Sequence, residues 1–346
     1  MLKEPKKILI IRSGAVGDVL MTTPLVKAVR KRFPKAKISY LVGNWSKDVL
    51  KNNPYVDSII SFNDSIIFKR DILKILALIK KLRREKFDIC FILDKSHWWN
   101  MLAYACRIKT RIGFNRNGEG FINTLSVDYK GEKNELEYYL DIAKLLKIKI
   151  KDKRLELFLT KKESQFANGF INKNNLKNKR IIGIAPGAAI NPGQKLLLKR
   201  WPKDKYTELI NKLIKNYNII LFGGKEDKEL CDSIISSIKN NSNNKLVNAC
   251  GMTLQQSAAL MKKCSLFITH DSGPMHIADA AGMPIIALFG PTGPKRFAPL
   301  KSIVIRKNLK CSPCYDIYGR YKKCKHHKCM ELINVEEVLR AAKKLL

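Results

Sequence analysis

The chain has 346 residues, of which 45% are hydrophobic and 28% are charged. This balance excludes collagen-like, low-complexity and small disulfide-scaffold proteins. Since a typical domain has about 150 residues, the length predicts about two domains. Lys and Arg number 66 against 30 Asp and Glu, a formal net charge of +36. We expect a polyanionic partner (nucleic acid, an anionic membrane surface or a phosphorylated substrate), with a solvated Lys-rich surface as the alternative.

Apolar runs of strand length alternate with amphipathic stretches through the first half of the chain. The predicted strands are Ile8–Ile11, Ile38–Val42, Ser58–Phe62 and Phe87–Leu93. The predicted helices are Leu20–Phe33 and Ile72–Arg84, which have apolar residues at helical spacing and Lys and Arg between them.

The same alternation returns in the second half. The predicted strands are Arg180–Ala185, Asn218–Phe222, Leu246–Asn248, Ser265–Thr269 and Pro284–Phe289. The predicted helices are Lys203–Lys215, Lys228–Lys239, Leu254–Lys263 and a final helix at 335–346. A polar stretch, Thr160–Lys179, lies between the two series and is the expected interdomain connection. The pattern predicts an α/β protein with two tandem Rossmann-like, doubly wound domains, at 1–160 and 161–346, facing a cleft.

The sequence shows no targeting or membrane-spanning segment. No stretch approaches about 18 uninterrupted apolar residues. The first apolar run ends at Arg12 after four residues, which is shorter than the apolar region of a signal peptide. We therefore expect a cytoplasmic protein.

The first predicted strand leads into a turn that holds Gly14, Gly17 and Asp18. Such a turn brings backbone amides toward an oxygen-rich ligand at a helix N-terminus. It lacks the Lys-Ser/Thr of a Walker A loop and the Gly-x-Gly-x-x-Gly fingerprint. Asp18 is a candidate proton acceptor, and an ordinary capping aspartate is the alternative.

Two segments in the second half have residues suited to anion binding. Lys199 precedes Arg200, Trp201 and Pro202, and a cation there is placed to pair with a diphosphate. After a buried strand, Asp271-Ser272-Gly273 opens a helix that contains His276. The amides and dipole of that N-terminus favour an anion, although an ordinary capped helix has the same pattern.

Together these segments, in this order and spacing, resemble glycosyltransferase family 9. The resemblance implies a GT-B fold and an inverting transfer of heptose from ADP-heptose to a lipopolysaccharide inner-core acceptor. The sequence has no Asp-x-Asp motif beside these segments, which agrees with a metal-independent reaction and no cofactor. In the family pattern Asp18 matches the general base and Lys199 the lysine on the donor diphosphate.

Further donor contacts are implied by the same resemblance. Glu226 matches the acidic residue on the ribose, and Met252 the residue near the adenine. The donor-binding turn is matched by Asp271, Ser272, Gly273 and His276. The loop before Lys199 is longer than the family pattern and has Lys195 as a rival cation. Another nucleotide sugar, a chain that only binds the donor, and a basic nucleic-acid-binding protein are the alternatives, the last suggested by charge alone.

Four cysteines, Cys311, Cys314, Cys324 and Cys329, mark a tail at 311–329. Their sulfurs, with His326 and His327, have the chemistry of a zinc site. The spacing is looser than in paired Cys-x₂-Cys ribbons, so reduced structural or redox-labile thiols are the favoured interpretation and zinc the alternative.

The first half also has features suited to an anionic acceptor. His97, Trp98 and Trp99 follow a predicted strand, and we favour packing or membrane contact over sugar stacking. Lys109, Arg111 and Arg116 would attract the phosphates of a glycolipid or an anionic leaflet. We therefore expect a nucleotide sugar, an anionic glycolipid and an anionic membrane surface as partners, no nucleic acid, and a peripheral location at the inner face of the cytoplasmic membrane.

Overall fold

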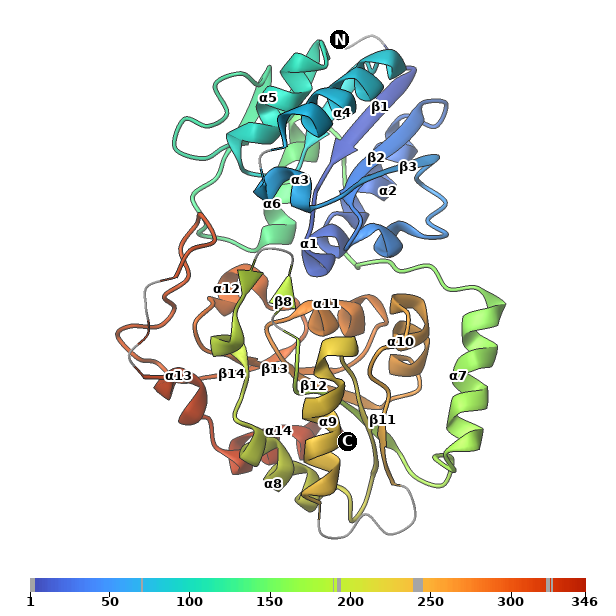
Figure 1. Cartoon of the computed structure of the whole chain (residues 1–346), viewed down its shortest axis with the longest axis vertical. Helices are drawn as coiled ribbons and strands as arrows, with labels where there is room; N and C mark the ends of the chain where they lie inside the picture. Colours follow the sequence, from blue (N-terminus) through green and yellow to red (C-terminus); the bar gives the residue numbers. More distant parts are fainter. Residues whose placement is uncertain are drawn as a thin grey trace. The chain divides into compact units, whose positions relative to one another are not determined.

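The computed structural model describes residues 4–69, 71–188, 190–191, 194–238, 245–321, 324 and 326–346. The chain divides into two compact units, Met1–Glu156 (unit 1) and Leu157–Leu346 (unit 2), each with its own sheet and helices (Figure 1). None of the helices in these ranges is long and apolar enough to cross a lipid bilayer.

Unit 1 has a parallel sheet with helices on both faces. Its strands are β1 (Lys7–Ile11), β2 (Lys37–Gly43), β3 (Ser58–Phe62), β4 (Ile89–Ile92), β5 (Thr110–Asn115) and β6 (Leu125–Asp128). Its helices are α1 (Val16–Met21), α2 (Thr23–Arg32), η1 (Lys47–Leu50), α3 (Ser65–Phe68), α4 (Ile72–Glu85), α5 (His97–Ala105) and α6 (Glu135–Leu145).

Unit 2 has the same architecture. Its main strands are β7 (Ile181–Ala185), β10 (Asn218–Leu221), β11 (Leu246–Asn248), β12 (Leu266–His270), β13 (Ile285–Phe289) and β14 (Ile303–Arg306), with a ribbon of β8 (Ile190–Asn191) and β9 (Gln194–Lys195). Its helices are α7 (Lys161–Lys173), η2 (Leu197–Lys199), α8 (Lys203–Leu213), η3 (Lys225–Asp227), α9 (Lys228–Ser236), α10 (Leu254–Met261), α11 (Gly273–Ala280), α12 (Pro294–Phe297), α13 (Lys328–Glu331) and α14 (Val335–Leu345).

The two sheets share one strand order, which confirms the predicted Rossmann-like fold. The order is β3-β2-β1-β4-β5-β6 in unit 1 and β11-β10-β7-β12-β13-β14 in unit 2. In each sheet the order reverses between the first strand and the fourth, and ligands of such sheets bind beyond the strand ends at that point. The switch point lies between β1 and β4 in unit 1 and between β7 and β12 in unit 2.

The core of each unit lies between its sheet and the covering helices. In unit 1, Leu82 of α4 and Trp99 of α5 pack with Ile11 and Ile92 on one face of the sheet. In unit 2, Trp201 is buried, and its indole N–H donates to the carbonyl of Ile333 at 3.1 Å. The strands that end at the two switch points are thus fixed by buried apolar contacts.

The predicted helix at Leu20–Phe33 is wrong as one element, because the chain restarts at Thr22. Pro24 has no amide hydrogen to donate and its ring crowds the carbonyl of Leu20. Thr22 Oγ1 donates to the carbonyl of Val19, and Thr23 Oγ1 donates to that of Leu20, each at 2.7 Å. The break separates α1 from α2.

The polar stretch Thr160–Lys179, expected as a connection, mostly forms helix α7 of unit 2. Thr160 caps it, since its backbone N–H donates to Glu163 at 2.8 Å and its hydroxyl accepts from the amide of Lys162. Ala167 and Ile171 are buried while the Lys and Asn residues point outward. The polar composition therefore belongs to the outer face of an amphipathic helix.

Candidate active site

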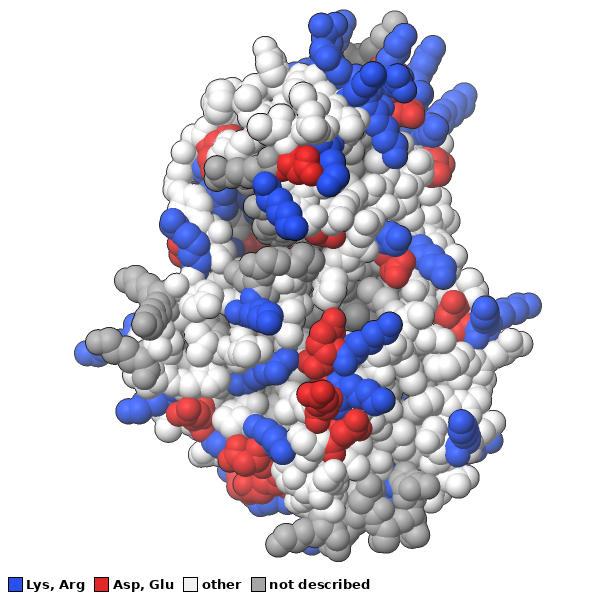
Figure 2. Space-filling view, in the orientation of Figure 1, with Lys and Arg blue, Asp and Glu red and all other residues white. Residues whose placement is uncertain are grey.

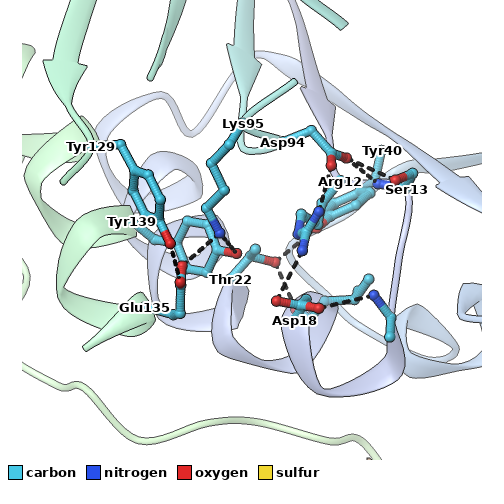
Figure 3. Close-up of polar contacts among 12 residues, drawn as sticks. Arg12, Ser13, Asp18, Thr22, Tyr40, Asp94, Lys95, Tyr129, Glu135 and Tyr139 are labelled. Atoms are coloured by element: carbon cyan, nitrogen blue, oxygen red, sulfur yellow. Dashed lines mark hydrogen bonds and ion pairs between the residues drawn. The ribbon is translucent and has the colours of Figure 1, made fainter. Parts of the chain in front are cut away.

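The switch point of unit 1 is occupied by an ion-pair network (Figure 3). Arg12, directly after β1, donates from Nη1 to Asp94 Oδ1 at 2.5 Å, and Asp94 follows β4. Asp94 Oδ2 also accepts from the amide and hydroxyl of Ser13, at 2.7 and 2.9 Å. The ends of the two central strands are thereby joined through one buried carboxylate.

Asp18 is the second carboxylate on Arg12. Its Oδ1 lies 2.9 Å from Arg12 Nη2, and its Oδ2 accepts from the amide of Ala15 at 3.0 Å. Asp18 is thus in the first turn of α1, as a capping residue would be. A capping role alone does not require the ion pair that Asp18 forms with the buried Arg12.

The Asp18 carboxyl is held ionised. Burial raises the pKa of this carboxyl, but the charges of Arg12 and Lys95 and the hydrogen bonds from Arg12 and Ala15 together lower it to about 2. The side chain keeps 25% of its surface exposed. An ionised carboxylate with one accessible edge is therefore present at the carboxyl end of β1.

Lys95 belongs to a second polar cluster beside this network (Figure 3). Its Nζ lies 2.5 Å from Glu135 Oε2 and donates to the Tyr139 hydroxyl at 3.3 Å. The Tyr129 hydroxyl donates to the other oxygen of Glu135. Glu135 opens α6 and is buried, so this pair fixes the Lys95 charge near Asp18.

The two glycines of the predicted loop lie beside Asp18. Gly14 is in the turn between β1 and α1, where an added Cβ would lie 3.3 Å from Ser46 Oγ. Gly17 is a buried residue of α1. Close packing under Gly14, and not a left-handed backbone, accounts for a small residue there.

At the switch point of unit 2, the structure brings Lys199 and Asp271 together. Lys199 Nζ lies 2.9 Å from Asp271 Oδ2, and both side chains are largely buried. Burial raises the pKa of Asp271, but Lys199, a hydrogen bond with Thr292 and the nearby His276 lower it below its ordinary value. Two predicted donor residues, far apart in sequence, thus form one ion pair.

The turn after β12 leads directly into α11. Ser272 is the N-cap residue, and its hydroxyl donates to the carbonyl of His270 at 3.1 Å. Gly273 is the first residue of α11, and His276, three residues further on, is buried in the first turn of the helix. The partial positive charge of this N-terminus is therefore next to the Lys199–Asp271 pair.

The other two predicted donor residues, Glu226 and Met252, lie in neighbouring loops. Glu226 is exposed in η3, after β10, and Met252 is half-buried in the loop after β11. The amide of Gly251 donates to the carbonyl of Gly223 at 3.1 Å, which holds the two loops together. Both residues are at the carboxyl edge of the same sheet as Asp271.

Asp227, which the sequence patterns do not single out, organises this edge. It is buried and accepts from the amide of Ala188 at 2.8 Å, from Arg200 Nη2 at 2.9 Å and from the amide of Gly224 at 3.0 Å. One carboxylate therefore ties the loop after β7 to the loop after β10. The sequence signal that identifies Asp227 is an acidic residue close to the glycine pair Gly223-Gly224 at the end of a strand.

Arg12 and Asp94 are likewise missed by sequence reasoning. Arg12 appears only as the charge that ends an apolar run, and Asp94 as the residue after a predicted strand. The two residues lie close together because β1 and β4 are parallel neighbours, and the carboxyl ends of parallel strands lie at the same edge of the sheet. The strand order, which the sequence does not state, is therefore needed to find this pair.

The described residues of the cysteine tail are not arranged around a metal site. Cys311, Cys314, Cys324 and Cys329 are free thiols. Across the described ranges, no three His, Cys, Asp or Glu side chains are grouped closely enough to hold a metal ion. Cys329 is buried on α13, and burial raises the pKa of its thiol to about 11.

The tandem Rossmann-like units, with charged groups at both switch points, have the architecture of a glycosyltransferase with the GT-B fold. Comparison with known proteins makes the relationship specific. The model of glycosyltransferase family 9 (heptosyltransferase) matches residues 75–325. The chain therefore belongs to this family and is a glycosyltransferase.

Relatives span nearly the whole chain. The lipooligosaccharide heptosyltransferase 2 of Campylobacter jejuni is 30% identical over 98% of both chains. The lipopolysaccharide heptosyltransferase 2 of Escherichia coli is 30% identical over 87% of this chain and 88% of its own. Among solved structures, the E. coli ADP-heptose lipopolysaccharide heptosyltransferase II has a TM-score of 0.77 at 25% identity, covering 98% of each chain.

Proposed function

We propose that this protein transfers heptose from ADP-heptose to an inner-core hydroxyl of a lipopolysaccharide glycolipid, with inversion at the anomeric carbon and without a metal ion. The observation that carries the proposal is the Asp18 carboxylate, ionised and partly exposed at the end of β1. The sugar and acceptor are supported by the relatives, which are heptosyltransferases by name.

Asp18 would act as the general base. Its carboxylate takes the proton of the acceptor hydroxyl as that oxygen bonds to the anomeric carbon. A carboxylate with a pKa of about 2 is a weak base, so it serves best by accepting the proton late, when the hydroxyl oxygen has become acidic. Arg12 fixes its orientation by the 2.9 Å contact.

The leaving group would be stabilised by unit 2. As the bond from the anomeric carbon to the diphosphate breaks, negative charge grows on ADP. Lys199, whose Nζ donates to Asp271 Oδ2 at 2.9 Å, would place its positive charge against a phosphate oxygen. The N-terminus of α11 adds partial positive charge at the same place.

A decisive experiment replaces the carboxylate alone. We expect Asp18→Asn to lower kcat at least about 100-fold, since base catalysis contributes about 10²–10⁴. Calorimetric binding of ADP-heptose should stay within about threefold. Asp204→Asn is the matched control, because Asp204 is an exposed first-turn aspartate of α8.

Unchanged turnover by Asp18→Asn would remove Asp18 from the mechanism. A screen of nucleotide sugars in the same calorimeter tests the donor, and tighter binding of another sugar nucleotide would replace ADP-heptose. Full activity after treatment with a chelator is the expected result for the metal-independent reaction.

A further inference from the structure

Helix α4 has an outer face that no part of the described chain covers. Its inner side chains, Leu78, Ile79 and Leu82, pack against the sheet. Most outward side chains of its first turns are apolar, and Leu73 is 80% exposed, Ile72 69% and Leu76 54%. The exposed Lys74 among them pairs with Asp71. Solvent-exposed apolar side chains gathered in one place mark an interaction surface.

Helix α5 continues this face. The Sγ of Cys106, at the end of α5, lies 3.9 Å from the carbonyl of Ile79 in α4, so the two helices are neighbours on one side of the sheet. Trp99 points inward to the core, while Trp98, Met101 and Tyr104 point outward and are about half exposed. We call the outward side chains of the two helices the α4–α5 face: Ile72, Leu73, Leu76, Trp98, Met101 and Tyr104.

Cations follow the apolar turns along α4. Its last turns carry Lys80, Lys81, Arg83 and Arg84, and within the described ranges none of these four forms an ion pair. Figure 2 shows Lys and Arg gathered at the top of the view, where α4 ends, beside a largely uncharged surface over α4 and α5. Arg111 and Arg116 do not contribute, since Arg111 donates to backbone carbonyls and Arg116 pairs with Glu119.

A basic groove of about 760 Å³ opens at the same end of unit 1. The cations that line it are Lys6, Arg83, Lys86, Arg107 and Lys109. Its two carboxylates are already engaged: Asp88 accepts from the amides of Lys6 and Lys7, and Glu4 pairs with Arg32. Because the five cations outnumber the two carboxylates, the groove has an excess of positive charge that favours an external anion.

We propose that the α4–α5 face and this groove form a docking surface for an anionic lipid bilayer. The apolar side chains enter the headgroup region, Trp98 and Tyr104 lie at the level where amphipathic rings are favoured, and the groove cations meet lipid phosphates. The proposal rests on the glycolipid acceptor of the proposed function, because it brings the enzyme to the surface where that acceptor lies.

Charge complementarity favours a bilayer over a protein partner. The apolar side chains and the cations lie on successive turns of one helix, so a single anionic bilayer surface can contact both. The chain as a whole has a net charge of +36, so its long-range attraction to an anionic surface is strong. α5 itself has no acidic residue to repel the headgroups.

The test measures sedimentation of the full-length protein with vesicles that contain neither donor nor acceptor. With phosphatidylcholine vesicles holding about 30% phosphatidylglycerol we expect binding that weakens as salt is raised, and with pure phosphatidylcholine at least about tenfold weaker binding. Leu73→Glu/Leu76→Glu should reduce binding to anionic vesicles at least about tenfold, because it removes apolar insertion and adds negative charge.

The matched control is Leu300→Glu/Leu332→Glu in unit 2. These leucines are 57% and 46% exposed, and the change in net charge is identical. We expect the control to bind vesicles within about twofold of the unchanged protein. An equal loss of vesicle binding in both variants would overturn the proposal, and so would equal binding of the unchanged protein to neutral and anionic vesicles. The proposal would also fail if the protein bound an acidic protein but no vesicles.

A separate assay distinguishes this failure from failure of the proposed function. Transfer to a core oligosaccharide freed of its lipid should be unchanged in Leu73→Glu/Leu76→Glu, whereas transfer to glycolipid in vesicles should fall. If the unchanged protein binds vesicles but transfers no heptose, the docking surface stands and the proposed reaction fails. Loss of transfer to the lipid-free acceptor in this variant would overturn a role confined to docking.

Discussion

At the scale of single residues, Arg12 is the counter-ion of two carboxylates. Asp94 takes one of its terminal nitrogens and Asp18 the other, at 2.5 and 2.9 Å. Burial on its own would lower the pKa of this guanidinium, but the two carboxylates reverse that effect and raise it well above the ordinary value. Arg12 is therefore a permanent charge that keeps Asp18 ionised and in place.

We predict that Arg12→Gln raises the pKa of Asp18, since burial is then opposed mainly by Lys95. In the unchanged enzyme the pKa of Asp18 is about 2, so protonation of Asp18 does not lower kcat/KM at moderately acidic pH. In Arg12→Gln an acidic limb should appear at least about one pH unit higher. The pH profile of kcat/KM measures this shift.

The same substitution has an effect on stability with a defined sign. A carboxyl with a lowered folded pKa stabilises the protein above its unfolded pKa of about 3.9, and this contribution is lost as pH falls toward about 2. Arg12→Gln should therefore lose less stability than the unchanged protein over that acid range. Arg12→Lys, which keeps the charge, is the control, and an acidic limb that does not move would refute the role of Arg12.

At the scale of elements, the strand-end loops of unit 2 are held by close backbone approach to one carboxylate. Gly187, after β7, leaves room for the Asp227 carboxyl, which a Cβ at that position would overlap. A Cβ on Gly223 would lie 2.6 Å from the Cβ of Asp227. The two glycines are thus required by packing around Asp227.

We predict that Gly187→Ala destabilises unit 2 by about 1–3 kcal/mol, the range expected when a methyl group is forced into a filled space. Gly169→Ala is the matched control, because Gly169 is exposed within α7 and an added Cβ meets no atom within 4 Å. That change should stabilise by about 0.5–1 kcal/mol through helix propensity. Urea denaturation of both variants measures the difference, and a neutral Gly187→Ala would show that the loop adjusts freely.

The sequence predicts most strands of the two sheets, including the edge strands β3 and β11, but it misses β5, β6 and β14. β7, β13 and the part of β1 after Lys7 are continuous runs of apolar residues because helices cover both faces of the sheet. β6 and β14 are edge strands with partly exposed side chains, so their patterns resemble loops, and neither is predicted. The helix break at Thr22 is visible in retrospect from Pro24.

In the candidate site, too, some residues can be predicted from the sequence and others only from the structure. The residues that the family pattern singles out, such as Lys199 and Asp271, come together in space. The side chains that position the site, Arg12, Asp94 and Asp227, have no motif of their own and become visible only when the strand order is known. Whether the predicted residues hold donor and acceptor as proposed stays a prediction.

At the scale of the whole molecule, the net charge of +36 is spread over a chain with many solvated lysines. Like charges repel one another in the compact state and destabilise it. Exposed ion pairs such as Lys212–Glu336 contribute little against this repulsion. We therefore expect electrostatics to oppose folding at low ionic strength.

We predict that the urea midpoint rises as sodium chloride is increased from about 0.02 to about 0.3 M, because the Debye length shortens and repulsion is screened. Potassium chloride should act equally, since the effect depends on ionic strength. Uncharged sucrose at the same osmolality is a control for general solute effects. A midpoint that falls with salt would show that the ion pairs outweigh the repulsion.

The division of the chain between residues 156 and 157 has a consequence for engineering. The proposed base is encoded entirely before this junction and the proposed nucleotide contacts entirely after it. Chimeras that exchange the second part for that of a relative should consequently inherit the relative's preference among activated sugars while retaining the parent's choice of hydroxyl. A single crossover point would then suffice to build a panel of hybrid enzymes.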